Sequence, residues 1–169
     1  MANVIVDLST SLDGYIAGPN DGRTTPLGDG GGALFEWMGA GPEANRVDPR
    51  ICPPDASRPV VDEWQAEAGA MVSGRRTFDI AGGWKDGHPI DVPIFVVTHE
   101  PPTDGEWSPQ VEFVTEGVER AIARAKEVAG DNKVSLAAAS VVQQALRAGL
   151  VDEMPRGRVP RRAGGPTRR

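Results

Sequence analysis

The sequence predicts an α/β fold, a three-layer αβα arrangement in which a mainly parallel sheet carries helices on both faces. Short apolar runs rich in β-branched residues alternate with segments of helical periodicity, which is typical of a parallel sheet covered on both sides. The clearest strand, at residues 92–98, is almost continuously apolar, as a strand buried on both faces must be. The 169 residues suffice for one domain with a sizeable core.

The first part of the chain is expected to be rich in loops. In order, we expect a strand at 4–9, a turn-rich segment at 9–18, a glycine-rich loop at 28–32, one or two helical turns at 34–38, a long loop at 39–59, and a helix with apolar positions 60, 61, 64 and 68. The glycine-rich loop lacks the Lys-Ser/Thr pair of a Walker-type phosphate loop, so we predict a flexible lid there.

The second part of the chain shows the regular alternation more clearly. In order, we expect a buried strand at 69–73 ending at Gly74, a helix at 75–80 closed by Gly82 and Gly83, strands at 92–98 and 111–115, a helix with apolar positions 118, 121, 122, 125 and 128 ended by Gly130, a strand at 134–136, and a helix with apolar positions 141, 142, 145 and 146. For this last helix we predict a capping box of Ser140 and Gln143 and a C-terminal cap at Gly149 and Leu150.

From residue 155 on, the chain consists mainly of Arg, Gly and Pro, and such a segment buries too little apolar surface to order itself. We therefore assign residues 1–154 to the domain and residues 155–169 to a basic, disordered tail.

Composition excludes several classes of site. A single cysteine, Cys52, permits no internal disulfide, and only two histidines, His88 and His99, argue against a zinc or non-haem iron centre. The net charge is −6 although the C-terminal segment is basic, so nucleic acid is not the expected partner. The N-terminus opens directly into a strand and no apolar stretch approaches 18 residues, so we expect no signal peptide, no membrane span and a cytoplasmic location.

Four segments occur in the order and spacing of a known family. They are residues 11–17 (SLDGYIA), 74–78 (GRRTF), 95–99 (FVVTH) and 145–153 (ALRAGLVDE). With them, the chain resembles the dihydrofolate-reductase-like family over residues 3–153. It is most similar to the branch that includes the C-terminal reductase domain of the bifunctional riboflavin-biosynthesis deaminase–reductase.

The resemblance implies a dihydrofolate-reductase-like sheet that binds NADPH across the carboxyl ends of its strands. It implies hydride transfer to a small-molecule substrate, either pteridine-like or ribosylaminopyrimidine-like. Relatives in this family are commonly dimers, so the resemblance also implies a homodimer. The cofactor-binding residues that it implies are Ser9, Ile16, Ala17, Gly74, Arg75, Arg76, Thr77, Thr98, His99, Ala138, Ala139, Ser140 and Val141. Asp13 and Glu36 are the candidate catalytic residues, and no metal is implied.

These residue types suit the roles that the resemblance gives them. Arg75 or Arg76 could pair with the 2′-phosphate that distinguishes NADPH from NADH, and Thr98 and His99 would complete that pocket. The turn at 137–140 would hold the pyrophosphate through main-chain amides. Ser9, Ile16 and Ala17 would flank the nicotinamide, with Ile16 shielding it from water.

Plainer readings stay open beside the functional ones. His99 could be a solvated residue at a strand end, Glu36 a solvent-facing acid on a short helix, and Asp13 a residue that organises its own turn.

Two departures from the family pattern favour an alternative function. Ala137 and Ala138 replace a Gly-Gly pair before the last helix, where alanine tolerates positive φ and close backbone contact less well. After Glu153, a Pro- and Arg-containing segment replaces two expected strands, as a truncation or a shifted reading frame would produce. The alternative is a catalytically silent nucleotide-binding or dimerising relative. A third reading, in which the Arg-rich tail contacts nucleic acid or an acidic membrane, has weaker support.

Overall fold

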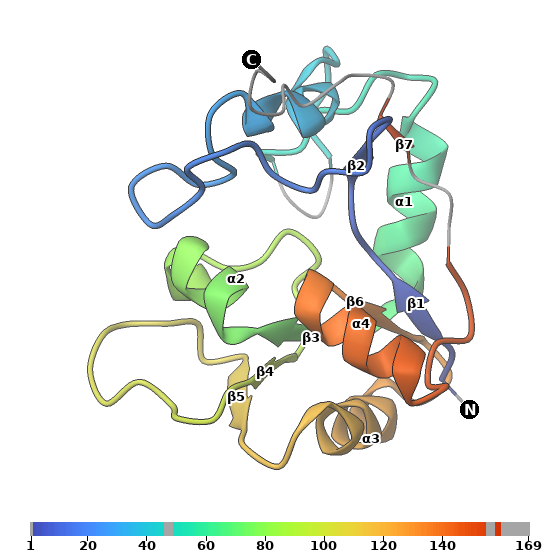
Figure 1. Cartoon of the computed structure of the whole chain (residues 1–169). Helices are drawn as coiled ribbons and strands as arrows, with labels where there is room; N and C mark the ends of the chain where they lie inside the picture. Colours follow the sequence, from blue (N-terminus) through green and yellow to red (C-terminus); the bar gives the residue numbers. More distant parts are fainter. Residues whose placement is uncertain (1, 46–48, 155–157, 160–169) are drawn as a thin grey trace. The chain divides into compact units, whose positions relative to one another are not determined.

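The computed structural model describes residues 2–45, 49–154 and 158–159 (Figure 1). These residues form two compact units, one at 2–8 and 66–154 and the other at 9–45, 49–65 and 158–159. Within the described ranges, no helix combines the length and the apolar character needed to cross a membrane.

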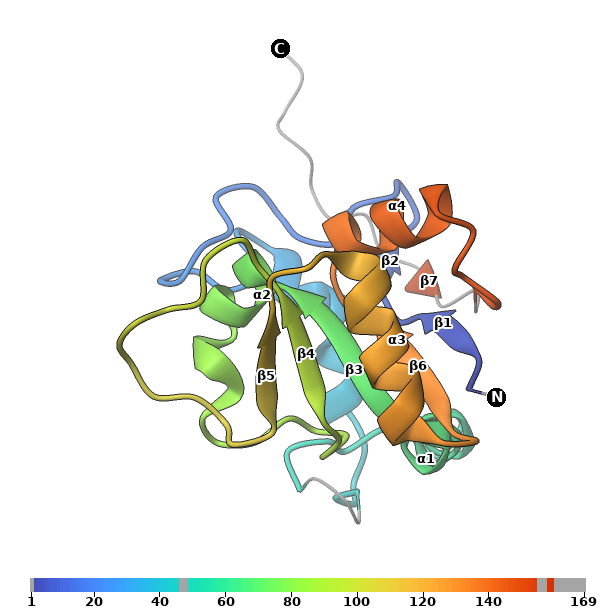
Figure 2. The ribbon, with the colours of Figure 1, turned by 90° about the horizontal axis from the view of Figure 1, so that it is seen from below.

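A five-stranded sheet forms the centre of the first unit. Its strands are β1 (Val4–Val6), β3 (Ala68–Gly74), β4 (Ile94–Val97), β5 (Val111–Val114) and β6 (Lys133–Leu136). Their spatial order is β1-β6-β3-β4-β5, and each neighbouring pair is parallel (Figure 2). The predicted mainly parallel sheet is therefore confirmed.

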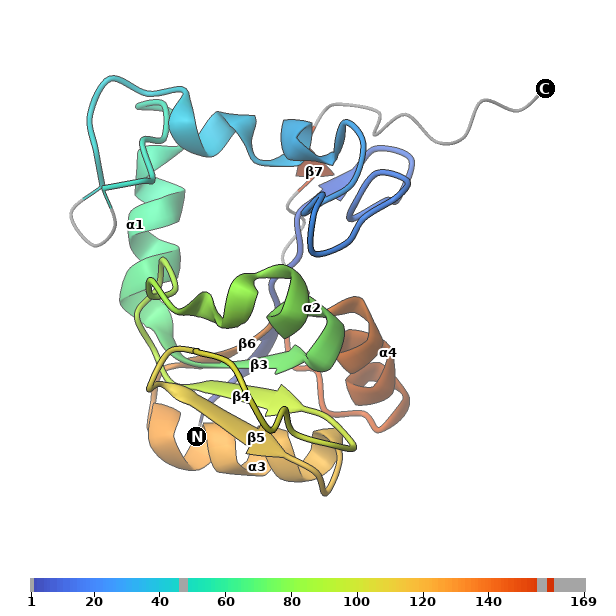
Figure 3. The same cartoon turned by 90° about the vertical axis from the view of Figure 1, so that its left-hand side faces the viewer.

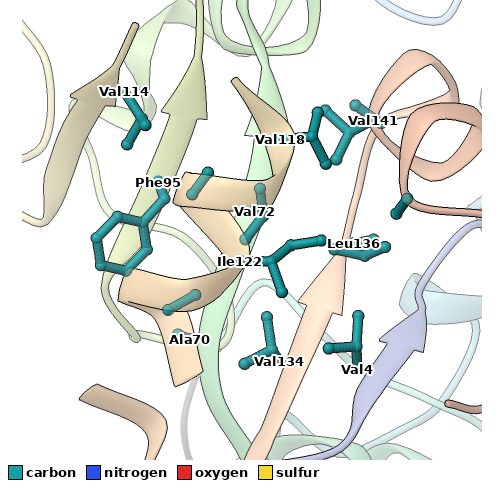
Figure 4. Close-up of a cluster of buried hydrophobic side chains, with 14 of the residues drawn as sticks. Val4, Ala70, Val72, Phe95, Val114, Val118, Ile122, Val134, Leu136 and Val141 are labelled. Carbon is teal, nitrogen blue, oxygen red and sulfur yellow. The ribbon is translucent and has the colours of Figure 1, made fainter. Parts of the chain in front are cut away.

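Helices cover both faces of this sheet, as predicted. Helices α3 (Val118–Ala129) and α4 (Ala139–Arg147) lie on one face, and α2 (Arg75–Ile80) lies on the other (Figure 3). Val72 and Leu136, from two adjacent strands, pack with Ile122 of α3 in the core under the first face (Figure 4). Because side chains alternate along a strand, the intervening residues of the same strands point to the face of α2.

An aromatic cluster attaches α2 and the loop between β4 and β5 to that second face. The ring of Phe78 meets those of Trp107 and Phe113 edge-on, with centroids 6.2 and 5.1 Å apart. Trp107 also covers Gly83 in the short 3-10 helix η3 (Gly82–Trp84), where a Cβ atom would lie 2.8 Å from the Cβ of Trp107. Glycine is required at position 83 because the loop packs directly on its backbone.

The second unit contains mostly loops and short helices. It holds β2 (Thr10–Ser11), η1 (Gly31–Leu34), η2 (Glu36–Gly39), nearly all of α1 (Arg58–Glu67), and β7 (Arg158–Val159), which pairs in parallel with β2.

The glycine-rich loop at 28–32 packs against an earlier part of the same unit. A Cβ atom on Gly28 would lie 2.4 Å from the carbonyl oxygens of both Gly18 and Pro19. The side chain of Asn20 donates a hydrogen bond to the carboxylate of Asp29 (2.7 Å). The close contact gives Gly28 a packing role that the predicted flexible lid did not include.

Several predicted boundaries need correction. The strand expected at 4–9 is divided, because β1 ends at Val6 and β2 starts at Thr10. Ala68, expected on a helix, is the first residue of β3. On α3, Val128 is 55% exposed although it was assigned to the apolar face. The buried position is Ala129, eleven residues after Val118, because an α-helix returns to the same face after three full turns.

The two ends of α4 differ in how well the sequence predicted them. The predicted capping box is wrong: Ala138 is the N-cap residue, no side chain caps the helix, and Ser140 lies inside its first turn. Leu146, expected on the buried face, is 46% exposed. The C-terminal cap is confirmed, since Gly149 has a φ of 68° and the amide of Leu150 donates to the carbonyl of Ala145 (2.9 Å), as in a Schellman motif.

After α4 the chain lies along the outer edge of β1. Glu153 forms a parallel bridge with Ile5, and the carboxylate of Asp152 accepts a hydrogen bond from the amide of Val4 (2.8 Å). Of the predicted disordered tail, residues 155–157 and 160–169 lie outside the described residues, whereas Arg158–Val159 forms β7.

Candidate functional site

The starts of α2 and α4 lie side by side at the carboxyl ends of two adjacent strands. Gly74 is the last residue of β3 and the N-cap of α2, with extended backbone angles (φ −104°, ψ 161°). A Cβ atom there would lie 3.3 Å from Oγ of Ser140 and 3.5 Å from Cβ of Ala138. The glycine therefore permits the close approach of the two helix starts.

The two helices leave the sheet in opposite directions. They follow the adjacent strands β3 and β6, but α2 runs over one face and α4 over the other (Figure 3). Open α/β sheets bind ligands outside the carboxyl ends of their strands, at a point where the helices that follow two adjacent strands leave over opposite faces. Gly74, Ala138, Ser140 and Val141, all predicted cofactor residues, meet at this point.

A hydrogen-bonded group joins α2 to the turn after β4. Nε of Arg75 donates to both carboxylate oxygens of Asp79 (3.0 and 3.1 Å), and Nη1 donates to the carbonyl of Glu100 (2.7 Å). The same carbonyl accepts a hydrogen bond from the hydroxyl of Thr98 (2.9 Å). We call these four residues the Arg75 clamp. Sequence reasoning selected Arg75 and Thr98 but missed Asp79, whose i,i+4 spacing was visible, and Glu100, whose main-chain carbonyl leaves no sequence signal.

The other predicted residues of this region differ in exposure. Arg76 and His99 are exposed, whereas Thr77 and Ala139 are partly buried. The backbone of Ala138 is extended (φ −146°, ψ 132°), so the position does not require the positive φ that would favour glycine. Replacement of Gly-Gly by Ala137 and Ala138 therefore causes no backbone strain at this turn.

The remaining predicted residues belong to the second unit. Ser9 and Ala17 are partly buried, Ile16 and Asp13 are exposed, and Glu36 is exposed at the first residue of η2.

The turn that carries Asp13 is held by a residue that the sequence did not single out. Oγ of Ser11 accepts a hydrogen bond from the amide of Tyr15 (2.9 Å) and donates one to its carbonyl (3.2 Å). Ser11 is buried, but Leu12 and Tyr15 are exposed (60% and 46%), so the tip of the turn presents apolar side chains.

Two buried hydroxyls lie on the α2 face of the sheet. Ser73 of β3 and Ser135 of β6 are fully buried, and neither Oγ has a hydrogen-bond partner. Among the described residues, no group of three or more His, Cys, Asp or Glu side chains could hold a metal ion.

The chain is similar in sequence to one protein family and in structure to solved proteins. The family model described as the RibD C-terminal domain matches residues 2–169. A protein from Shewanella sp. PV-4 that is described as a riboflavin biosynthesis protein is 26% identical, with a TM-score of 0.56, over 98% of this chain and 80% of that one. Dihydrofolate reductase from Enterococcus faecalis, solved with NADP(H) and RAB-propyl, is 16% identical, with a TM-score of 0.47, over 86% of this chain and 65% of that one. No curated protein sequence matches.

Proposed function

The chain belongs to the RibD C-terminal domain family, and from this premise we propose that it is an NADPH-dependent reductase. Membership of this family supports an oxidoreductase, as the sequence predicted. We propose hydride transfer to a ribosylaminopyrimidine-like or pteridine-like substrate. The description of the Shewanella sp. PV-4 protein favours the first of these two substrate classes.

The observation that carries the proposal is the meeting of Gly74, the start of α4 and the Arg75 clamp at the carboxyl ends of β3, β6 and β4. Guanidinium groups suit phosphate oxygens because their donors are charged and fixed in a plane. Two arginines, Arg75 and Arg76, stand at this edge of the sheet. The donors present there fit an anionic dinucleotide.

The residues of this chain would bind and orient the two reactants. Arg76 and His99 would contact the adenosine-side phosphate, and the residues at 138–141 would line the pyrophosphate. Ile16 would exclude water from the reacting carbon atom, with Ser9 and Ala17 beside it. A bound NADPH would supply the hydride, and correct positioning provides much of the catalysis in such reactions.

A proton must also reach the reduced substrate. Asp13 and Glu36 are the candidate donors, each on a segment of the second unit. Both carboxylates are exposed to solvent, and water could donate the proton in their place.

Titration with NADPH tests the proposal. Nicotinamide fluorescence should change on mixing, and the bound cofactor should be oxidised when a ribosylaminopyrimidine or pteridine substrate is added. An Arg76→Ala variant should bind NADPH more weakly and NADH unchanged. Absence of any NADPH binding at millimolar cofactor would refute the proposal.

A catalytically silent nucleotide-binding relative is the second candidate. It is favoured by the exposure of Asp13 and Glu36, since no Asp or Glu among the described residues is fully buried. NADPH binding without turnover of any pteridine or pyrimidine substrate would select this candidate.

A further inference from the structure

The end of the chain pairs with its beginning at two places, and the register is the same at both. In the first unit, Glu153 forms a parallel bridge with Ile5. In the second unit, Arg158 of β7 lies opposite Thr10 of β2, again in parallel. The two residues of each pair are 148 positions apart (153 − 5 and 158 − 10). No residue is therefore inserted or deleted between the two places of pairing.

Main-chain hydrogen bonds show which residues near the N-terminus face the end of the chain. The carbonyl of Val4 accepts from the amide of Glu153 (3.1 Å), and the amide of Val6 donates to the carbonyl of Glu153 (3.1 Å). The amide of Asp7 donates instead to β6 (3.0 Å), and that of Ser11 to its own turn (2.9 Å). Even-numbered residues of the first strands therefore direct their main chain to the end of the chain, as alternation in a parallel ladder requires.

The same alternation predicts the orientation of β7. Glu153 directs both its amide and its carbonyl to β1, and every second residue of a parallel strand does so. With the register unchanged, the main chain of Val159 is directed to Thr10, whereas the amide of Arg158 is directed away from β2. The two residues of β7 are thus expected to differ in their hydrogen bonds.

Pairing of this kind does not require apolar side chains. The ladder is formed by amides and carbonyls, so a segment rich in Arg and Pro can contribute to it. In the sequence, Pro155 removes one donor from the phase that bonds, and Pro160 has the phase in which no donor is needed. The composition that predicted disorder therefore does not exclude a strand here.

Strand β2 leads directly into the turn that carries Asp13. Ser11 ends β2 and holds the turn through hydrogen bonds of its hydroxyl with the amide and the carbonyl of Tyr15 (2.9 and 3.2 Å). Because the turn is closed on its own first residue, it is expected to move with β2 as one piece. Pairing of β2 with β7 therefore fixes the orientation of the turn.

Resting on the reductase function proposed above, we infer that β7 positions the segment at residues 9–17 for hydride transfer. The amide of Val159 is the group responsible, because it joins β7 to the main chain of Thr10. Val159 is a positioning residue, since it acts through the turn. Loss of this contact slows the reaction more than it weakens NADPH binding, because Gly74 and the start of α4 belong to the first unit.

The experiment compares Val159→Pro and Arg158→Pro in the full chain, since only the first removes an amide that faces β2. Hydride transfer from NADPH to a phosphoribosylaminopyrimidine is followed in a single turnover. We expect Val159→Pro to slow it at least about tenfold, because a misplacement near 1 Å can cost about a hundredfold. The Kd for NADPH should rise by less than about threefold, which separates positioning from binding.

Two controls are matched to this variant. Arg158→Pro introduces the same ring at the neighbouring position, and Val159→Ala keeps the amide of position 159. Both should transfer hydride at the wild-type rate. An equal loss in Val159→Ala and Val159→Pro would overturn the role of the amide, and so would an unchanged rate in Val159→Pro.

Hydrogen exchange of the wild-type chain tests the pairing without cofactor or substitution. Relative to an unstructured peptide of the same sequence, the amide of Val159 should exchange more slowly than that of Arg158, because only the first is a ladder donor. Equal, unslowed exchange of the two amides would overturn the inference even if Val159→Pro failed to fold.

The outcomes also separate this inference from the proposed function. A wild-type chain that binds no NADPH and transfers no hydride refutes the reductase function, whatever its exchange rates. An active wild-type chain with a Val159→Pro variant that loses rate and NADPH affinity equally indicates a structural role only, and refutes the positioning role alone.

Discussion

At the scale of single residues, the glycines of the 28–32 loop fall into two kinds. Gly28 and Gly30 both have positive φ (69° and 72°), but only Gly28 is packed against other main chain. A side chain at Gly30 would meet nothing within 4 Å. Composition alone cannot distinguish them, because the close contact of Gly28 with Gly18 and Pro19 forms only in the folded loop.

Alanine substitution should separate these two kinds of glycine. Gly30→Ala introduces only the strain of positive φ, about 1 kcal/mol. Gly28→Ala adds overlap with two carbonyl oxygens and should cost about 1–3 kcal/mol more. Urea denaturation of both variants measures the difference, and equal losses would contradict the observed packing.

In the candidate site, too, the sequence predicted some features, whereas others depend on contacts that form only in the folded chain. The step at residues 74–77 was identifiable because a glycine followed by arginines at a strand end is a recognisable local pattern. The engagement of Arg75 was not, because one of its partners is a main-chain carbonyl 25 residues away. Similarly, the turn at residues 11–15 is fixed by the hydroxyl of Ser11.

At the scale of elements, α3 offers a direct test of which face is buried. Ile122 is 2% exposed in the core, whereas Val128 is 55% exposed. Ile122→Ala should lower the free energy of unfolding by about 2–5 kcal/mol through the cavity it leaves. Val128→Ala should change it by less than about 0.5 kcal/mol, since alanine is also the better helix former. If chemical denaturation showed that Val128→Ala lowers the free energy of unfolding by several kcal/mol, Val128 would face the core, as the sequence predicted.

The start of β6 is tied to neighbouring segments by Lys133, and this contact should depend on pH. Nζ of Lys133 contacts the carboxylates of Glu67 (2.7 Å) and Glu153 (3.5 Å). The hydrogen bond to Glu67 raises the pKa of Lys133 above its usual value of 10.5. A raised pKa in the folded state means that the stabilisation is complete below pH 10.5 and is lost as the pH rises through the folded pKa.

Lys133→Met provides the comparison. The difference in unfolding free energy between wild type and variant should be largest near pH 8 and should shrink above pH 10.5. Denaturant titrations at both pH values measure it, and a constant difference would show that the charge of Lys133 contributes nothing.

Elements with strong local signals were predicted well from the sequence. The helix at residues 75–80 has the predicted bounds, and β3, β4, β5 and β6 lie where apolar runs indicated strands. Errors occurred where the local pattern was ambiguous. Val128 and Ala129 are both apolar, so spacing alone could not decide which one faces the core, and Ser140 resembles a cap residue although the chain is already helical at Ala139.

At the scale of the whole molecule, the net charge of the chain predicts that nucleic acid is not its partner. The chain carries a net charge of −6 and its pI is about 4.9, although its last segment is rich in arginine. We expect no binding to duplex DNA at moderate salt, because an acidic protein repels the phosphate backbone. A gel-shift titration tests this. A salt-sensitive shift that disappears when residues 155–169 are deleted would instead identify the basic segment as a nucleic-acid contact.

The position of β1 in the sheet has a consequence for synthesis on the ribosome. This strand is translated before the other strands of the sheet, yet its neighbour β6 begins at residue 133 and its edge contact is Glu153. A nascent chain therefore carries β1 without a partner until almost all of the later strands have been translated. Pairing of such distant segments slows folding and prolongs exposure of apolar strands. Expression should consequently be limited more by co-translational aggregation, and by chaperone supply, than by the stability of the finished sheet.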